Sequence, residues 1–201
     1  MRSRIVALTF VALLFAARGF AAQQVPGQIV YKDRTVDVTF VIGSFLGGIS
    51  IESLQSRIRY LDERGKRKKL KPRDAEEIRF NWNGEEIRMI SRDPSVGFGN
   101  GNRKKFLHLI IEGKLRMFEY IVTRRSGGGP NGVGATTTTS IYHLFQKENA
   151  PMLMPKAIGF RKQMSEYFSD CPLLVDLIQN KDLKRRDLEE IVFYYNKNCA
   201  Q

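Results

Sequence analysis

The strongest constraint on the fold is an alternation of apolar and polar residues that runs, with interruptions, from about residue 28 to residue 146. It is clearest where apolar side chains occupy every second position: Val36, Val38, Phe40 and Ile42. A period of two places these side chains on one face of a β-strand, whereas the apolar face of a helix repeats every 3.6 residues. We therefore expect the middle of the chain to form a β-sheet with an apolar face.

Turn signals divide this region into antiparallel hairpins. Asn83-Gly84 separates the alternating segments 78–82 and 87–91. The type I′ turn that such a pair favours needs positive φ at both central residues, which asparagine and glycine tolerate. A second hairpin is expected around residues 112–114, where Glu-Gly-Lys separates two apolar segments.

Two glycine-rich stretches interrupt the alternation, at residues 95–102 and 126–140. The second contains a GxGxxG spacing, but no helical pattern follows it and no Lys-Ser/Thr pair completes a phosphate-binding loop. We interpret both stretches as surface loops, with a further strand at residues 141–146. The sequence predicts no nucleotide or other cofactor.

In the last quarter of the chain the apolar period changes to that of a helix. Phe160, Met164 and Phe168 form one apolar stripe at intervals of four residues. Pro172 suits the first turn of a second helix, where its missing N–H is tolerated. A third apolar stripe begins at Leu188.

Together these patterns predict an α+β protein. We expect an antiparallel β-sheet or partly open barrel of six to eight strands at residues 22–155. A C-terminal unit of about three short helices, at residues 156–201, is expected to pack on or beside it. A hydrophobic content of 42% and a charged fraction of 27% argue against a disordered chain.

The first 21 residues have the organisation of a signal peptide. Arg2 and Arg4 precede an apolar run at residues 5–17, which is too short to span a bilayer. Ala21 and Ala22 flank the predicted cleavage site, because small residues occupy the −3 and −1 positions. The alternative is an uncleaved anchor or a buried helix. Since no later stretch approaches 18 apolar residues, we expect an exported protein without a transmembrane helix in the mature chain: periplasmic, outer-membrane-associated or extracellular.

The chain has two cysteines, Cys171 and Cys199, too few for a disulfide-dense mini-protein or a four-thiolate zinc site. Cys171 precedes the second predicted helix and Cys199 follows the third. If these two helices pack antiparallel, the two cysteines lie side by side. An exported chain passes an oxidising compartment, so we predict a disulfide; the alternative is two free thiols.

The chain is strongly basic, with 33 Lys and Arg against 21 Asp and Glu and a formal charge of +12. Removal of the three arginines in the predicted signal peptide leaves +9. Seven cations are concentrated in ten residues: Arg64, Lys66, Arg67, Lys68, Lys69, Lys71 and Arg73. We predict an anion-binding patch formed by six of them: Lys66, Arg67, Lys68, Lys69, Lys71 and Arg73.

Such a patch suits an anionic envelope component, such as lipopolysaccharide or a glycan, or another envelope protein. Nucleic acid is disfavoured, because no aromatic residues alternate with the cations to stack on bases. The alternative interpretation is a hairpin kept soluble by lysines, which prevent sheet edges from pairing with other chains.

Segments of the sequence resemble exported proteins of unknown function from Bacteroidetes-type bacteria. The resemblance rests on Phe106–Tyr120 with its Glu-Gly-Lys turn, on the Tyr-Phe-Ser-Asp-Cys-Pro of residues 167–172, and on the Tyr-Tyr-Asn-Lys-Asn-Cys of residues 194–199. It covers most of the chain after the signal peptide, but these motifs are structural. The resemblance implies a Gram-negative envelope setting and assigns no catalytic residue.

No catalytic motif is present in the sequence. The HExxH, GxSxG and CxxC spacings are all absent. His108 and His143 are the only two histidines, each on a predicted strand, and nothing nominates further ligands for a metal site. The sequence therefore favours a non-enzymatic binding or structural module of the cell envelope. The alternatives are an envelope hydrolase with a site assembled from scattered strand residues, and an exported nucleic-acid binder.

The disulfide prediction can be tested by a free-thiol assay on denatured, unreduced protein. We expect no reactive thiol, because Cys171 and Cys199 are bonded to each other. After reduction the same assay should find two thiols per chain. Two thiols before reduction would contradict the prediction.

Overall fold

The computed structural model describes residues 20–45, 48–94, 104–127, 135–148 and 150–199. Most of the predicted signal peptide and the predicted loop at residues 95–102 lie outside these residues. Ala21 and Ala22, which flank the predicted cleavage site, lie at the start of the first strand.

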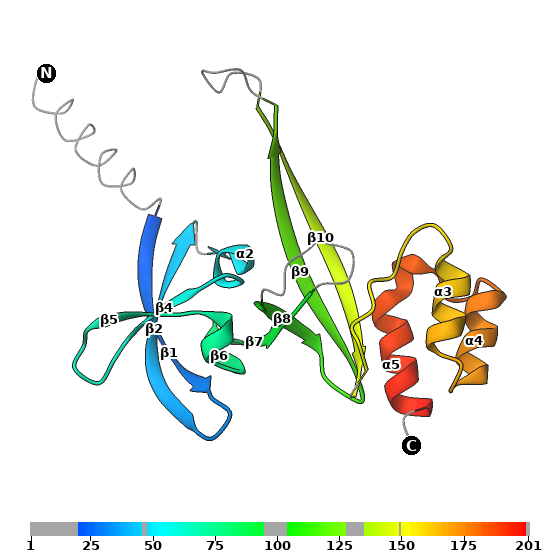
Figure 1. Cartoon of the computed structure of the whole chain (residues 1–201), viewed down its shortest axis with the longest axis horizontal. Coiled ribbons are helices and arrows are strands. Elements are labelled where there is room, and N and C mark those ends of the chain that lie inside the picture. Colours follow the sequence, from blue (N-terminus) through cyan, green and yellow to red (C-terminus); the bar gives the residue numbers. More distant parts are fainter. Residues whose placement is uncertain (1–19, 46–47, 95–103, 128–134, 149, 200–201) are drawn as a thin grey trace, which may run out of the picture.

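The protein is α+β, as predicted, with one large antiparallel sheet followed by C-terminal helices (Figure 1). The strands are β1 (Phe20–Val30), β2 (Thr35–Phe45), β3 (Gly48–Ile49), β4 (Ile58–Leu61), β5 (Arg67–Leu70), β6 (Glu77–Trp82), β7 (Glu85–Arg92), β8 (Lys105–Ile111), β9 (Leu115–Ser126) and β10 (Thr136–Lys147). The helices are α2 (Ile51–Leu54), α3 (Phe160–Tyr167), α4 (Pro172–Gln179) and α5 (Leu188–Asn198), with 3₁₀ turns η2 (Pro72–Asp74) and η3 (Arg185–Asp187).

The prediction of six to eight strands is wrong, because the sheet has ten. Strand β1 was not predicted, because four residues interrupt its apolar alternation: Gln23, Gln24, Pro26 and Gly27. Strand β3 has two residues, too few for any periodic signal.

The sheet is open, with the strand order β10-β9-β8-β7-β6-β1-β2-β4-β5 and with β3 paired to β2. Strands β5 and β10 therefore form its two ends. The first strand in the sequence, β1, lies inside the sheet between β6 and β2. Of the two predicted forms, the described part of the chain adopts the open sheet.

The turn between β6 and β7 has the predicted conformation. Asn83 has a φ of 52° and Gly84 a φ of 90°, both in the left-handed region. This turn fixes the register, in which Trp82 pairs with Glu85 and Ile78 with Met89. The alternating apolar side chains of both strands are consequently buried on one face of the sheet.

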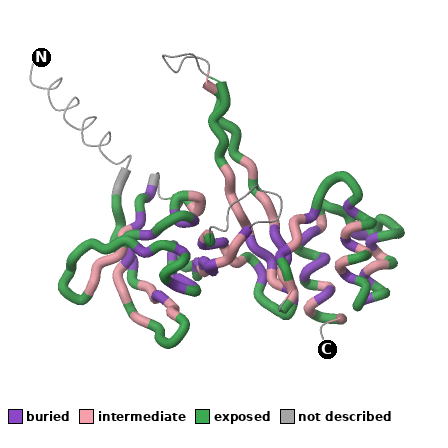
Figure 2. Tube along the Cα trace, viewed as in Figure 1, coloured by how far each residue is buried: buried purple, intermediate pink, exposed green. Residues whose placement is uncertain are grey.

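Strand β10 begins earlier than predicted. Thr136 pairs with Ser126 and Ser140 with Val122, so the threonines assigned to a loop form a strand. Threonine favours extended structure, but the glycines before it hid this signal. The β9–β10 hairpin extends away from the rest of the molecule, and its residues near positions 123–126 and 136–139 are exposed (Figures 1 and 2).

The core consists of three apolar clusters on the two faces of the sheet. The first, which includes Phe40 and Ile78, fills the face of β1, β2 and β4–β7. The second, the helix cluster, joins Met117 and Phe145 on the same face to α3, α4 and α5. The third, which we call the Phe118 cluster, lies on the opposite face: Ile90, Leu107, Phe118, Leu144 and Met152.

The helical unit is closed by the cysteines and anchored by Lys147. Cys171 and Cys199 form a disulfide with their Cα atoms 5.5 Å apart, at the start of α4 and the end of α5. The Lys147 ammonium on β10 donates to Asp170 Oδ1 at 2.6 Å and lies 4.8 Å from the centre of the Tyr195 ring. Partial burial opposes ionisation of Asp170, but hydrogen bonds from Lys147 and Tyr195 hold the pKa of its carboxyl below the ordinary value.

Side-chain amides complete the backbone hydrogen bonding of β9. The register pairs β9 with β8 only at Met117, Phe118 and Glu119. Before these residues in β9, the Asn196 amide accepts from the N–H of Leu115 at 2.8 Å and donates to its C=O at 2.9 Å. After them, Gln55 makes the same pair of bonds with Ile121, both at 2.7 Å.

The close approach of Asn196 depends on Gly113. A Cβ atom at this position would lie 2.4 Å from Asn196 Nδ2. Any larger residue would therefore displace the amide that binds Leu115.

We expect Asn196→Ala to lower the free energy of unfolding by about 2 kcal/mol, because it leaves a partly buried N–H and C=O without partners. Asn198→Ala is the matched control on the same helix. Its exposed amide donates only to the C=O of Tyr194, and the change should stay within about 0.5 kcal/mol. Urea denaturation measures both values, and equal stabilities of the two variants would contradict the role of Asn196.

Candidate functional site

The cations of the predicted basic run lie in two different settings. Lys66, Arg67, Lys68 and Lys69 lie on or beside β5, the end strand of the sheet, and are exposed. Their side chains alternate: Arg67 and Lys69 lie on the face of Arg59, whereas Lys68 lies on the face of Tyr60. Lys68 Nζ also approaches Asp62 Oδ2 at 3.8 Å. This part of the run has the position expected of lysines that protect a sheet edge.

Lys71 and Arg73, at the end of the run, face a different part of the molecule. They line a groove of about 1180 Å³ bounded by α2, the turn η2, the start of β8 and the middle of β9. Turn η2 contacts β8, which brings cations from three separate parts of the sequence to this groove. The five cations of the groove are Arg57, Lys71, Arg73, Lys104 and Lys105.

The groove offers cations and hydroxyl groups with little opposing charge. Its hydroxyl groups come from Ser50, Ser53, Ser56 and Thr123, and among the described residues that line it the one acidic residue is Glu52. The Glu52 carboxylate is already engaged, since it accepts from Thr123 N at 3.1 Å and from Thr123 Oγ1 at 2.8 Å. Lys105 Nζ donates to Ser56 Oγ at 2.9 Å, which holds this ammonium at the wall of the groove.

Sequence reasoning missed Arg57, Lys104 and Lys105 as partners of Lys71 and Arg73. Lys104 and Lys105 are visible in the sequence as part of a basic run at residues 103–105, immediately after a predicted loop. Nothing local indicates that this pair lies next to η2, because the contact between β8 and η2 joins segments about thirty residues apart.

A second groove, of about 1240 Å³, lies at the β4–β5 hairpin and contains Lys66, Lys68 and Arg64. It also contains three acidic residues, Asp37, Asp62 and Glu63. Positive and negative charges are therefore mixed in it, and it attracts anions less than the first groove does.

The two histidines come together in the structure. His108 and His143 lie on β8 and β10, each directly opposite Glu119 on the intervening strand β9. His108 Nδ1 is 3.8 Å from Glu119 Oε1, and the interaction with His108, although opposed by burial, holds the pKa of Glu119 below its ordinary value. This row lies between the first apolar cluster and the helix cluster, and the two grooves above are lined by other residues.

Among the described residues, no three His, Cys, Asp or Glu side chains are placed to hold a metal ion. None of the described helices combines the length and hydrophobicity needed to span a bilayer.

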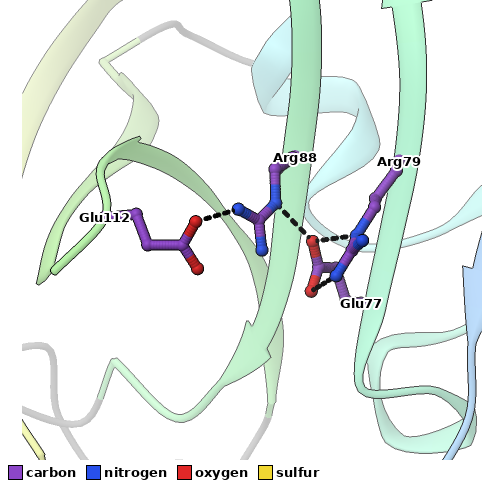
Figure 3. A network of polar contacts seen from close by, with 4 residues as sticks. All are labelled: Glu77, Arg79, Arg88 and Glu112. Atoms are coloured by element: carbon purple, nitrogen blue, oxygen red, sulfur yellow. Dashed lines mark hydrogen bonds and ion pairs between the residues drawn. The ribbon is translucent and has the colours of Figure 1, made fainter.

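A network of arginines and carboxylates lies on the face of the sheet that carries the Phe118 cluster (Figure 3). Glu77 Oε1 accepts from Arg79 Nε at 2.7 Å and from Arg88 Nε at 2.6 Å, and Arg88 also pairs with Glu112. Burial would raise the pKa of Glu77, but the two arginines together hold it below its ordinary value. Glu77 and Glu112 together thus balance the charges of two guanidinium groups that lie directly opposite each other in the register.

Comparisons of the chain with protein-family models, with curated proteins and with solved structures found no match.

We expect Glu77→Gln to reduce stability in a pH-dependent manner. The folded-state pKa of Glu77 is lowered, so its contribution is complete above the unfolded pKa of about 4.3 and is lost as the pH falls through the folded value. Urea denaturation should show a loss of about 2–3 kcal/mol at pH 7. The difference from the unaltered protein should shrink towards pH 3.

The matched control is Glu86→Gln, which removes an exposed carboxylate from the same strand pair. Its effect should stay within about 0.5 kcal/mol at both pH values. A Glu77→Gln deficit that persists unchanged at pH 3 would show that the carboxylate charge is not responsible.

Proposed function

We propose that this chain is an exported cell-envelope protein that acts as a non-enzymatic binding module for an anionic envelope component. Export is supported by the leader-like first 21 residues and by a disulfide, which persists in oxidising compartments. The proposed binding site is the groove between α2, η2, β8 and β9.

The observation that carries the proposal is the charge balance of this groove. Five cations face it and its single carboxylate is occupied by Thr123. Cations gathered at a concave surface raise the local concentration of anions and bind them by releasing counterions. Hydroxyl groups along one wall add hydrogen-bond partners suited to sugars and phosphate esters.

The proposed ligand is an anionic glycan or the phosphorylated sugar region of lipopolysaccharide. Single-stranded nucleic acid fits less well, because Tyr120 is the one aromatic residue among the described residues that line the groove.

The alternative of an envelope hydrolase would require acid and base groups inside a cleft. His108, Glu119 and His143 supply such groups on three neighbouring strands. They form a row between two packed apolar clusters, and none of the three lines either groove. We therefore favour binding over hydrolysis.

The proposal is tested by heparin chromatography of two triple variants with equal loss of charge. The groove variant carries Arg57→Gln, Lys71→Gln and Lys104→Gln, and the edge variant carries Lys66→Gln, Arg67→Gln and Lys69→Gln. None of these six side chains forms an ion pair within the described part of the chain. We expect the groove variant to elute at clearly lower salt than the edge variant, because three of its ligand contacts are lost.

Immobilised lipopolysaccharide provides the second arm of this experiment and should rank the variants in the same order. An equal loss of retention in both variants would indicate that net charge alone governs retention. A larger loss in the edge variant would instead assign binding to β5, as the sequence first suggested.

A further inference from the structure

Among the arginines on the face of the sheet that carries the Phe118 cluster, four form two pairs. In the first pair, Arg79 and Arg88 are opposite each other and Glu77 binds both (Figure 3). Two partly buried guanidinium groups that lie next to each other repel each other. The carboxylate of Glu77, which lies between them, reduces this repulsion, and Glu112 adds a second negative charge beside Arg88.

The second pair, Arg92 and Arg116, lines a separate pocket of about 430 Å³. Arg92 ends β7 and is held in place by two acceptors: its Nη1 donates to the C=O of Ser91 at 2.9 Å and its Nε to Gln146 Oε1 at 3.3 Å. Arg116 lies on β9 directly opposite Gln146. Gln146 therefore lies beside both arginines, in the place that corresponds to Glu77 in the first pair.

In the second pair, no carboxylate of the described residues binds the two arginines as Glu77 binds Arg79 and Arg88. Within the described residues, neither Arg92 nor Arg116 has an ion-pair partner at 4.0 Å or closer. Glu76 and Glu77 act on Arg92 only from a longer distance, and Glu148 at the pocket mouth is exposed. Burial first, and then the charge of Arg116, hold the pKa of Arg92 below its ordinary value.

We propose that the Arg92–Arg116 pocket binds a single phosphate or sulfate group, free or as a monoester, which supplies the charge that Glu77 supplies to Arg79 and Arg88. Guanidinium groups bind tetrahedral oxyanions through paired, charge-assisted hydrogen bonds. Lys114 and Lys147 also line the pocket; the Lys147 ammonium is paired with Asp170, so Lys114 supplies the further positive charge. A pocket of this volume holds one oxyanion with a small carrier group and is less than half the size of the groove beside α2.

This site is independent of the groove, because the two share no lining residue. A negative binding result at one of the two sites therefore does not contradict binding at the other.

Isothermal titration with inorganic phosphate tests the pocket, and glucose 6-phosphate forms the second arm. The variants are Arg116→Gln and, as a matched control, Arg79→Gln, which removes an arginine from the same face that already has a carboxylate partner. We expect Arg116→Gln to weaken phosphate binding roughly tenfold or more, and Arg79→Gln to leave it unchanged. Tighter binding of glucose 6-phosphate would identify a monoester as the ligand, whereas preference for inorganic phosphate would identify the free ion.

A second variant, Gln146→Glu, places a carboxylate next to Arg92 Nε without changing the size of the side chain. The new carboxylate should compensate the positive charge of the two arginines and therefore abolish phosphate binding. Addition of phosphate should then no longer raise the Tm. The proposal is overturned if the unaltered protein binds neither probe at about 10 mM. It is also overturned if Arg79→Gln and Arg116→Gln reduce the affinity for phosphate equally. The same holds if the Gln146→Glu variant binds phosphate as tightly as the unaltered protein does.

Discussion

Every backbone N–H and C=O group in the interior of a protein needs a hydrogen-bond partner, and β9 finds partners beyond its neighbouring strands in two separate parts of the chain. Leu115, Ile121 and Thr123 are separated by even numbers of residues, so their backbone groups point to the same side of the strand. Asn196 of α5 binds the first, Gln55 the second and Glu52 of α2 the third. This one strand thereby ties the C-terminal helices and the α2 region to the sheet.

The same arrangement determines where the positive charge gathers. Because α2 and Gln55 fill the space where β8 and β9 diverge, the start of β8 is held next to η2 and the cations of both segments face one groove. On β5, by contrast, strand alternation separates neighbouring cations onto two faces. Charge that is continuous in the sequence is thus divided in space, while charge from distant segments is brought together.

The sequence predicted most of what depends on neighbouring residues. The Asn83-Gly84 turn, the apolar faces of β2, β6 and β7, the three C-terminal helices and the pairing of Cys171 with Cys199 all follow from local periods and spacings. Strand β1 could not be predicted, since its polar residues, Pro26 and Gly27 mask its alternation. The groove and the arginine pairs could not be predicted either, because they depend on strand order and on contacts between segments far apart in the chain.

The central position of β1 has a consequence for the order in which the sheet can be assembled. Its partner β2 follows after a four-residue connection, so this hairpin can close early and at small entropic cost. Its other partner, β6, begins only at Glu77, almost fifty residues after β1 ends. During synthesis or translocation one edge of β1 therefore stays unpaired until β6 arrives, and the two halves of the sheet meet late. In this interval the nascent chain carries an exposed strand edge, which is the stage at which a chaperone would protect it most effectively.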